Sequence, residues 1–136
     1  MNYWLVKSEP SKYSWDQFVQ DGRAVWDGIR NYGARNNLRA MKKGDRVFYY
    51  HSNEGLAIVG IAEVLREHYP DPTAEGDTWS AVELGPLKPL KRPVTLAEMK
   101  VTPTLSEMSL IKLSRLSVGP ITKAEFDLVV RMSNGK

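Results

Sequence analysis

The segment Val25–Asn31 carries the residues of this chain that are best suited to hold a small planar ligand. Trp26 stands there beside a carboxylate, Asp27, and close to an amide, Asn31. An aromatic ring can stack on a nucleobase while neighbouring polar groups read the edge of that base. Trp4, Trp15 and Trp79 are instead expected to pack in the core. The segment around Trp26 therefore predicts a pocket for a single base.

Positive charge is concentrated around this segment. Seven basic residues and two acidic ones lie between Arg23 and Arg46, whereas five acidic residues and one basic one lie between Arg66 and Leu87. Arg35, Arg39 and Lys42 recur at helical spacing, so they should line one ridge. Such a ridge could attract a polyanion. Chance clustering on a solvated surface would give the same pattern, and charge alone does not decide between the two.

Known patterns of catalytic and metal sites are missing from the sequence. The chain has no cysteine, which excludes disulfides, zinc–thiolate sites, iron–sulfur clusters and cysteine nucleophiles. Its two histidines, His51 and His68, lack the spacing of a zinc pair, and no G-x-S-x-G elbow or P-loop occurs. Ser52 next to His51 makes no dyad, because neighbours on a strand point to opposite faces. We expect a binding protein with no cofactor, metal or catalysis.

Several short elements must position these residues. Strands are predicted at residues 3–6, 47–50, 56–62 and 80–84, with an extended segment at 115–118. Helices are predicted at residues 15–20 and 32–43, and two more should follow the capping boxes Thr95/Glu98 and Thr122/Glu125. Consecutive strands without regular strand–helix alternation favour an α+β fold. We expect a curved, mostly antiparallel sheet or barrel with helices packed outside.

Length and composition fit one globular domain, residues 1–136. Hydrophobic residues make up 42% and charged residues 26%, with a net charge of +3, which excludes disordered and fibrous proteins. No apolar run is long enough for a membrane span, and no export leader is recognisable. No heptad pattern requires an assembly. We therefore expect a cytoplasmic monomer that does not interact with membranes.

Six short motifs in chain order resemble the EVE domain and together cover nearly the whole chain. They are Lys7-Ser8-Glu9-Pro10, Trp26–Tyr32 followed by Ala34-Arg35-Asn36, Met41–Asp45, Tyr50-His51-Ser52, Tyr69–Ala74 and Arg115–Val118. The resemblance implies a PUA-like fold, a curved β-barrel flanked by short helices. It also implies a relation to the YTH domain, which captures N6-methyladenine in an aromatic cage. EVE domains are implicated in binding flipped 5-methylcytosine and 5-hydroxymethylcytosine in DNA, and RNA ligands have been suggested.

The resemblance further implies which residues form the base-binding pocket. They are Lys7, Ser8, Glu9, Trp26, Asp27, Asn31, Tyr50, His51, Ser52, Arg115 and Ser117. Trp26 and Asp27 match the first cage tryptophan of YTH relatives and the polar residue after it. The second wall is assigned to residues 50–52, because no second tryptophan is found in a matching loop. Arg30, Arg35 and Arg39 are expected to bind phosphates.

This chain departs from the family at two glycines and in one loop. Gly33 and Gly119 stand where the family often has glutamine, which puts phosphate or base contacts at these positions in doubt. The segment after Ala74 is shorter than in many relatives, which would open the mouth of the pocket.

The predicted contacts have structural alternatives. Trp26 is expected to stack on the base, and Glu9 or Asp27 to accept a hydrogen bond from an exocyclic amino group. Both carboxylates could instead cap a turn or a helix, as could Asn31. His51 could be a hydrogen-bonded residue at a strand end, and Arg115 could pair with the acidic loop.

Two other functions compete with a reader of modified bases. One is an enzyme that acts on a modified nucleoside, with Glu9 or Asp27 as the general base. The other is a protein-interaction adaptor with a vestigial pocket. The three functions differ in what can be observed. A reader binds without turnover, an enzyme turns over free nucleosides, and an adaptor has no affinity for nucleic acid.

Overall fold

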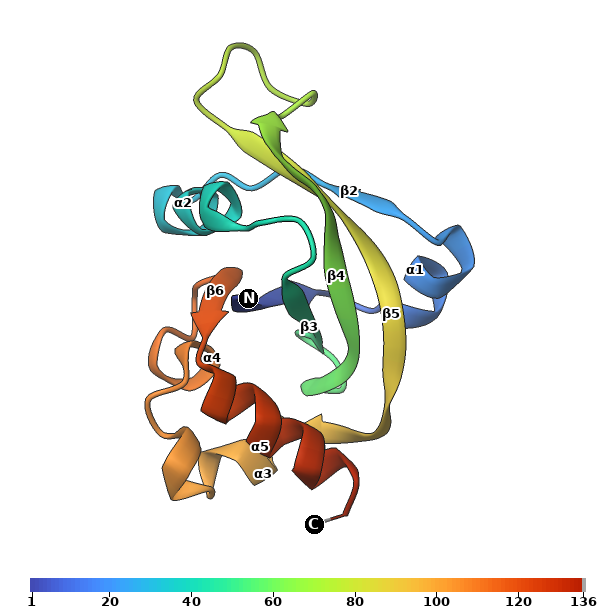
Figure 1. Cartoon of the computed structure of the whole chain (residues 1–136), viewed down its shortest axis with the longest axis vertical. Helices are drawn as coiled ribbons and strands as arrows, with labels where there is room; N and C mark the ends of the chain where they lie inside the picture. The colour runs from blue at the N-terminus through green and yellow to red at the C-terminus, as the bar shows by residue number, and fades with distance from the viewer. Residues whose placement is uncertain (136) are drawn as a thin grey trace.

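A curled, six-stranded sheet runs through the computed structural model, which describes residues 1–135, and short helices flank it (Figure 1). The elements are β1 (Tyr3–Ser8), α1 (Trp15–Asp21), β2 (Ala24–Trp26), α2 (Tyr32–Ala40), β3 (Arg46–His51), β4 (Ala57–Pro70), β5 (Ser80–Thr95), α3 (Leu96–Lys100), the 3-10 helix η1 (Pro103–Leu105), α4 (Ser109–Lys112), β6 (Val118–Ile121) and α5 (Lys123–Ser133). The strand order is β2-β5-β4-β3-β1-β6. Within residues 1–135, β1 and β3 are the only strands that pair in parallel. The expected α+β, mostly antiparallel architecture is confirmed.

Both faces of the sheet are buried, each against its own core. Val47 and Tyr49 of β3 belong to one core, together with buried residues of α1 and α2. Phe48 and Tyr50 belong to the other core, which buried residues of α3, α4 and α5 complete. Because successive side chains of a strand point to opposite faces, β3 is apolar on both sides. The two cores therefore explain its uninterrupted apolar sequence.

Helix α1 packs directly on strand β4. It begins after Ser14, whose side chain accepts a hydrogen bond from the backbone N–H of Gln17, as the sequence predicts. A Cβ atom at Gly60 would lie 2.5 Å from the ring of Trp15. The indole can therefore lie against the strand only because residue 60 has no side chain. This close approach fixes α1 beside the aromatic part of the first core.

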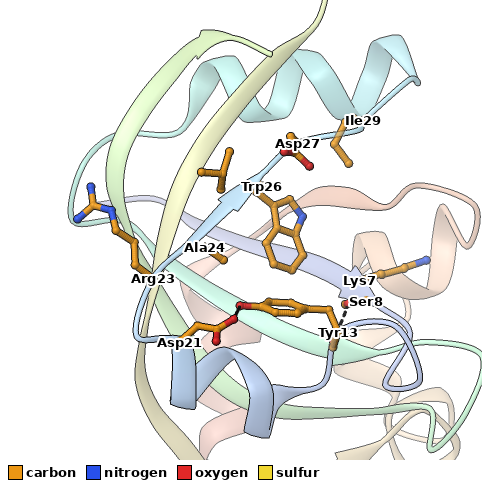
Figure 2. A pocket seen from close by; sticks show the side chains of 10 residues that line it. Lys7, Ser8, Tyr13, Asp21, Arg23, Ala24, Trp26, Asp27 and Ile29 are labelled. Carbon is orange, nitrogen blue, oxygen red and sulfur yellow. Dashed lines mark hydrogen bonds between the residues drawn. The ribbon is translucent and has the colours of Figure 1, made fainter. Parts of the chain in front are cut away.

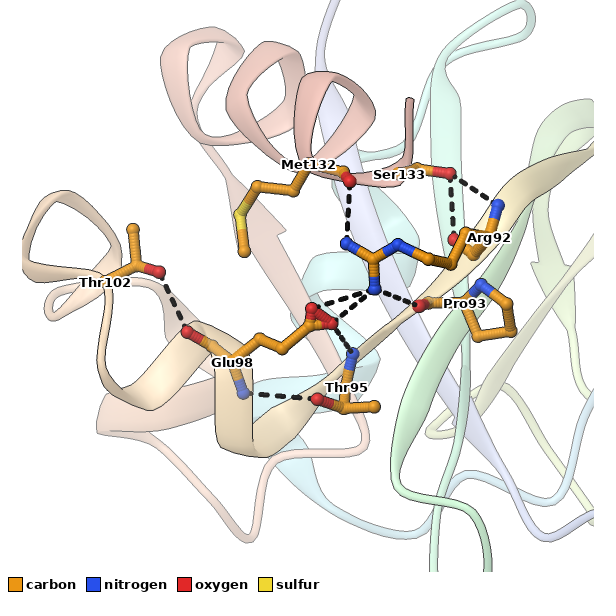
Figure 3. A network of polar contacts seen from close by, with 7 residues as sticks. All are labelled: Arg92, Pro93, Thr95, Glu98, Thr102, Met132 and Ser133. Carbon is orange, nitrogen blue, oxygen red and sulfur yellow. Dashed lines mark hydrogen bonds and ion pairs between the residues drawn. The ribbon is translucent and has the colours of Figure 1, made fainter. Parts of the chain in front are cut away.

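Arg92 of β5 holds together the end of the fold that contains α3 and α5 (Figure 3). Its guanidinium donates to both carboxylate oxygens of Glu98, at 2.6 and 2.9 Å, and to the carbonyl of Met132 at 2.8 Å. Glu98 also completes the capping box with Thr95 at the start of α3. The second predicted capping box, at the start of α5, is present as well. Both helix starts are confirmed.

Helix α2 is shorter than predicted, because the chain turns toward a buried carboxylate. The helix ends at Ala40 rather than at residue 43. Asp45, which is 3% exposed, accepts hydrogen bonds of 2.9 Å from the indole of Trp4 and from the backbone N–H of Lys42. These contacts require a turn directly after Met41. The apolar spacing of the helix gives no sign of that turn.

Other boundaries also differ from the prediction. Strands β4 and β5 extend well beyond the predicted residues 56–62 and 80–84, and several register shifts accompany their curvature. Strand β2 was not predicted, and residues 115–117 form a turn and a bend rather than an extended segment. Within residues 1–135, the helices are all too short or too polar to cross a bilayer.

Candidate functional site

A cavity of about 480 Å³ opens among the ends of β1, α1 and β2 (Figure 2). Its lining residues are Lys7, Ser8, Tyr13, Asp21, Arg23, Ala24, Val25, Trp26, Asp27 and Ile29. The volume falls in the range of about 300–1,000 Å³ that is typical of small-molecule sites. The cavity is therefore large enough for a nucleobase. Trp26, at which the sequence predicts a pocket, is among its lining residues.

Trp26 belongs both to the cavity wall and to the first core. Its indole points from β2 toward the ring of Tyr13 in Figure 2, with ring centroids 6.4 Å apart and planes inclined by 62°. Phe18 and Tyr49 contact the indole in edge-on arrangements at 6.4 and 5.7 Å. Only 8% of Trp26 is exposed. The ring is thus held firmly, and the part left uncovered is what a ligand could contact.

Tyr13 is the second aromatic wall of this cavity, and the sequence analysis did not assign it. Its hydroxyl donates to Asp21 at 2.8 Å, and its backbone carbonyl accepts from the hydroxyls of Ser8 and Tyr49. Burial and the hydrogen bond to Asp21 raise the pKa of Tyr13, so the phenol stays neutral. Its position before the helix cap, with Phe18 at the fourth helical residue, is typical of a hydrophobic staple. That spacing could have located it.

A cation and an anion line separate parts of the cavity. The ammonium of Lys7 donates to the carbonyl of Ser114 at 2.6 Å, and partial burial lowers its pKa. The carboxylate of Asp27 lies next to Trp26, and partial burial together with the negative charge of Asp71 raises its pKa. The wall therefore offers an acceptor at Asp27 and a donor at Lys7. A planar heterocycle with both kinds of group on its edge would match this arrangement.

The buried carboxylate of Asp71 positions the segment that follows Trp26. One of its oxygens accepts from the N–H of Gly28 at 2.8 Å and from Arg30 at 3.0 Å. The other accepts from the N–H and the hydroxyl of Thr73, at 2.7 and 2.6 Å. Burial alone would raise the pKa of Asp71, but these hydrogen bonds outweigh it and lower the pKa to about 2. Asp71 therefore stays ionised and holds the backbone next to Asp27.

The three arginines predicted to bind phosphates all contact the loop that connects β4 to β5. Arg30 pairs with the carboxylate of Asp71. Arg35 donates to the carbonyl of Thr78 at 3.0 Å, and Arg39 donates to that carbonyl and to the hydroxyl of Ser80. The acceptors of Arg35 and Arg39 are neutral groups. The positive charges of these two arginines are consequently not cancelled by the contacts that hold them.

Residues 50–52, the predicted second wall, do not line this cavity. Tyr50 is 3% exposed and packs in the second core. His51 lies at the end of β3, where its Nε2 accepts from the backbone N–H of Trp15 at 3.1 Å. Burial lowers the pKa of His51, which keeps that nitrogen available as an acceptor. The backbone N–H of Ser52 donates to the carbonyl of Ser8, so this segment supports the strand end that the cavity uses.

The remaining predicted residues lie beside the cavity rather than in its lining. Glu9 pairs with Lys12 at 3.6 Å, and Asn31 caps α2 by accepting from the N–H of Ala34 at 2.9 Å. Asn31 and Arg115 line a smaller cavity of about 200 Å³. The carbonyl of Ser117 accepts from the backbone N–H of Lys7 at 3.0 Å. Of the predicted pocket residues, four line the large cavity, namely Lys7, Ser8, Trp26 and Asp27.

Comparison with solved structures shows close relatives of the whole chain. The chain is 54% identical to a protein of Rhodopseudomonas palustris solved by NMR, with a TM-score of 0.95 over 98% of this chain and 94% of that one. It is 33% identical to the human THYN1 protein crystallised with DNA containing 5-methylcytosine, with a TM-score of 0.93 over 100% and 99% of the two chains. A yeast YTH domain shares the fold, at a TM-score of 0.58 and 12% identity.

Sequence comparison gives the same result. The chain is 36% identical to mouse thymocyte nuclear protein 1, over 96% of this chain and 73% of that protein. The family described as the EVE domain matches residues 2–132. The resemblance of the six motifs is thereby confirmed. With its curled sheet, its flanking helices and a match over nearly its whole length, the chain belongs to the EVE domain family.

Proposed function

We propose that this protein is a binding module that holds one modified base of a nucleic acid in the Trp26 cavity, without catalysing a reaction. The base is of the 5-methylcytosine or 5-hydroxymethylcytosine type. The observation that carries the proposal is the cavity wall, where Trp26 and Tyr13 stand beside Lys7 and Asp27. The relative crystallised with DNA containing 5-methylcytosine supports the choice of ligand.

The lining groups match the edge of a cytosine. Its exocyclic N4 amino group is a donor, for which the carboxylate of Asp27 is an acceptor. Its ring carbonyl is an acceptor, for which the ammonium of Lys7 is a donor. The apolar side chains of Ala24 and Ile29 also line the cavity. A 5-methyl group buried against such side chains would contribute about 1 kcal/mol.

The proposed partner is single-stranded DNA or RNA. Taking a base out of a duplex costs a few kcal/mol, so a single strand should bind more tightly. Arg35 and Arg39 would attract the phosphates, because their contacts leave their charge uncompensated. Arg30 would act mainly by holding the cavity wall through Asp71.

We further propose that residues 1–136 form a single domain that acts as a monomer. The expected cytoplasmic location gains no support from the relatives, whose name, thymocyte nuclear protein 1, refers to the nucleus.

The raised pKa of Asp27 favours a second candidate function. A carboxylate whose pKa is raised is a stronger base than an ordinary aspartate. An enzyme that acts on a modified nucleoside in the same cavity would use Asp27 as its general base. Incubation of the protein with free modified nucleosides, followed by chromatography, distinguishes turnover from binding.

The proposal is tested by fluorescence polarisation with matched single-stranded oligonucleotides. They carry cytosine, 5-methylcytosine, 5-hydroxymethylcytosine or N6-methyladenine at one position, in DNA and in RNA. We expect tighter binding to a 5-modified cytosine than to cytosine. Equal affinity for all four bases would contradict the proposal.

Variants of the charged lining residues connect this affinity to the cavity. Lys7→Gln and Asp27→Ala should each weaken binding of the modified oligonucleotide by about fivefold or more, since each removes one hydrogen bond to the base. Lys12→Gln removes the same charge from a side chain that is 78% exposed and outside the cavity lining, so it should change the affinity little. These residues are preferable to Trp26, whose removal would also open a hole in the core.

A further inference from the structure

A second aromatic pair lies between the start of α2 and the loop before β5. Tyr32 stacks on Trp79, with ring centroids 5.0 Å apart and planes inclined by 30°. The guanidinium carbon of Arg35 lies 4.9 Å from the centroid of Tyr32, and that of Arg30 lies 5.6 Å from the ring of Trp79. We call these four residues the Tyr32–Trp79 column.

The column is exposed to a degree that core packing does not explain. Tyr32 is 61% exposed and Trp79 is partly buried. Among residues 1–135, neither ring belongs to one of the two hydrophobic cores. A large aromatic side chain that remains in water gains little for the fold. An exposed aromatic stack with a guanidinium group at each end is, however, a surface on which a nucleobase can stack.

A short chain of hydrogen bonds connects the column to the Trp26 cavity. Arg30 of the column donates to Asp71, and Asp71 accepts from the backbone N–H of Gly28. Gly28 directly follows Asp27, which lines the cavity. The column and the cavity wall are therefore parts of one fixed surface. A strand whose base enters the cavity would continue past residues 28–32.

We propose that the Tyr32–Trp79 column stacks the base of a nucleotide that flanks the one held in the cavity, on a single-stranded nucleic acid. This inference rests on the proposed function. Bases stack on aromatic rings and on guanidinium planes alike, so a flanking base extends the column. The charge of Arg35, which its neutral acceptors leave uncompensated, attracts the phosphate between the two nucleotides. Because every base has a π-face, the column adds affinity with little sequence preference.

The test compares a mononucleotide with a trinucleotide by calorimetry. The ligands are 5-methyldeoxycytidine monophosphate and a single-stranded DNA trinucleotide with 5-methylcytosine at its centre. The wild-type protein should bind the trinucleotide about tenfold more tightly than the mononucleotide, as expected for one added stacking contact. Tyr32→Ala should remove this gain and leave the affinity for the mononucleotide unchanged.

Two further variants serve as controls. Tyr32→Phe retains the ring and should retain the gain, because stacking requires the ring and not the hydroxyl. Val101→Ala truncates a side chain that is 80% exposed and follows α3, and it should change neither affinity. Thermal unfolding of each variant establishes that it is folded.

The outcomes separate this inference from the function on which it rests. If Tyr32→Ala retains the full trinucleotide gain, the column only joins α2 to the loop, and the inference is overturned. If the wild-type protein fails to bind the mononucleotide but binds the trinucleotide through Tyr32, the cavity proposal fails and the column remains. Absence of binding to both ligands overturns both.

Discussion

The wall of the Trp26 cavity and the arginine-bearing face of α2 lie next to each other but use their polar side chains differently. In the described part of the chain, no other residue donates a hydrogen bond to the Asp27 carboxylate in the cavity wall. On the α2 face, Arg35 and Arg39 each donate to groups of the loop between β4 and β5. The cavity wall thus has an acceptor available to a ligand, whereas the two arginines use hydrogen bonds to hold the neighbouring loop in place. Charge in a sequence does not distinguish these two uses.

The largest effect is expected at Asp71, the buried carboxylate that holds the segment between the cavity wall and α2. Asp71→Ala removes the acceptor of Gly28 and Arg30. It should lower the free energy of unfolding by about 2–3 kcal/mol, because a buried charge network loses its centre. Urea denaturation measures this change. Asp77→Ala, which truncates an exposed carboxylate of the same loop, should cost less than about 0.5 kcal/mol. Equal effects would show that Asp71 has no special role.

In the wild-type protein, protonation of the same carboxylate at low pH should lower the free energy of unfolding. The pKa of Asp71 is about 2 in the folded chain, below its ordinary value of 3.8. A lowered folded pKa stabilises the protein above the unfolded pKa, and this stabilisation is lost as the pH falls from about 4 to about 2. The contribution is about 2 kcal/mol at neutral pH. Urea denaturation should give free energies of unfolding for the wild type and for Asp71→Asn that converge at the acidic end of this range. A constant difference between the two proteins would contradict the low pKa of Asp71.

Salt dependence distinguishes the arginines from one another. Arg35→Gln and Arg39→Gln should each reduce the slope of log affinity against log salt by about 1, if each neutralises one phosphate. Arg30→Gln should change this slope less, because its guanidinium already pairs with Asp71. Polarisation measurements with one oligonucleotide between about 50 and 200 mM salt provide the slopes. Unchanged slopes for both Arg35→Gln and Arg39→Gln would remove the phosphate role from this face.

The smallest effect is a pH dependence of binding that comes from the cavity wall. The pKa of Asp27 is raised, so its carboxylate gains a proton at a higher pH than an ordinary aspartate does. Affinity for a 5-modified cytosine should therefore be full at neutral pH and decline as the pH falls through that raised pKa. Asp27→Asn does not titrate, and its remaining pH dependence measures protonation of the base itself. Identical profiles for the wild type and Asp27→Asn would exclude Asp27 as the acceptor.

The sequence predicted the elements that local chemistry determines. Ser14, Thr95 and Thr122 cap helices where their spacing from glutamine or glutamate indicated. The apolar runs of β3 and β4 reflect burial on both faces of the sheet. The end of α2 could not be predicted in this way, because it depends on Asp45 binding the distant indole of Trp4.

The candidate site was predictable only in part. Trp26 and Asp27 form a local motif, and both line the cavity. Tyr13 faces Trp26 because α1 folds back across the sheet, and Asp71 reaches Gly28 from more than forty residues away. Pairings of this kind arise from tertiary structure. The resemblance placed residues 50–52 in the second wall, but burial of Tyr50 on the other face of the sheet leaves Tyr13 in that position.

The location of the modified base in a complex tests the central claim most directly. A crystal structure with a single-stranded oligonucleotide that carries one 5-methylcytosine would provide it. We expect the modified base to lie inside the cavity, in contact with Trp26 and Tyr13, with its amino group toward Asp27. A base bound elsewhere on the surface, with the cavity left empty, would contradict it.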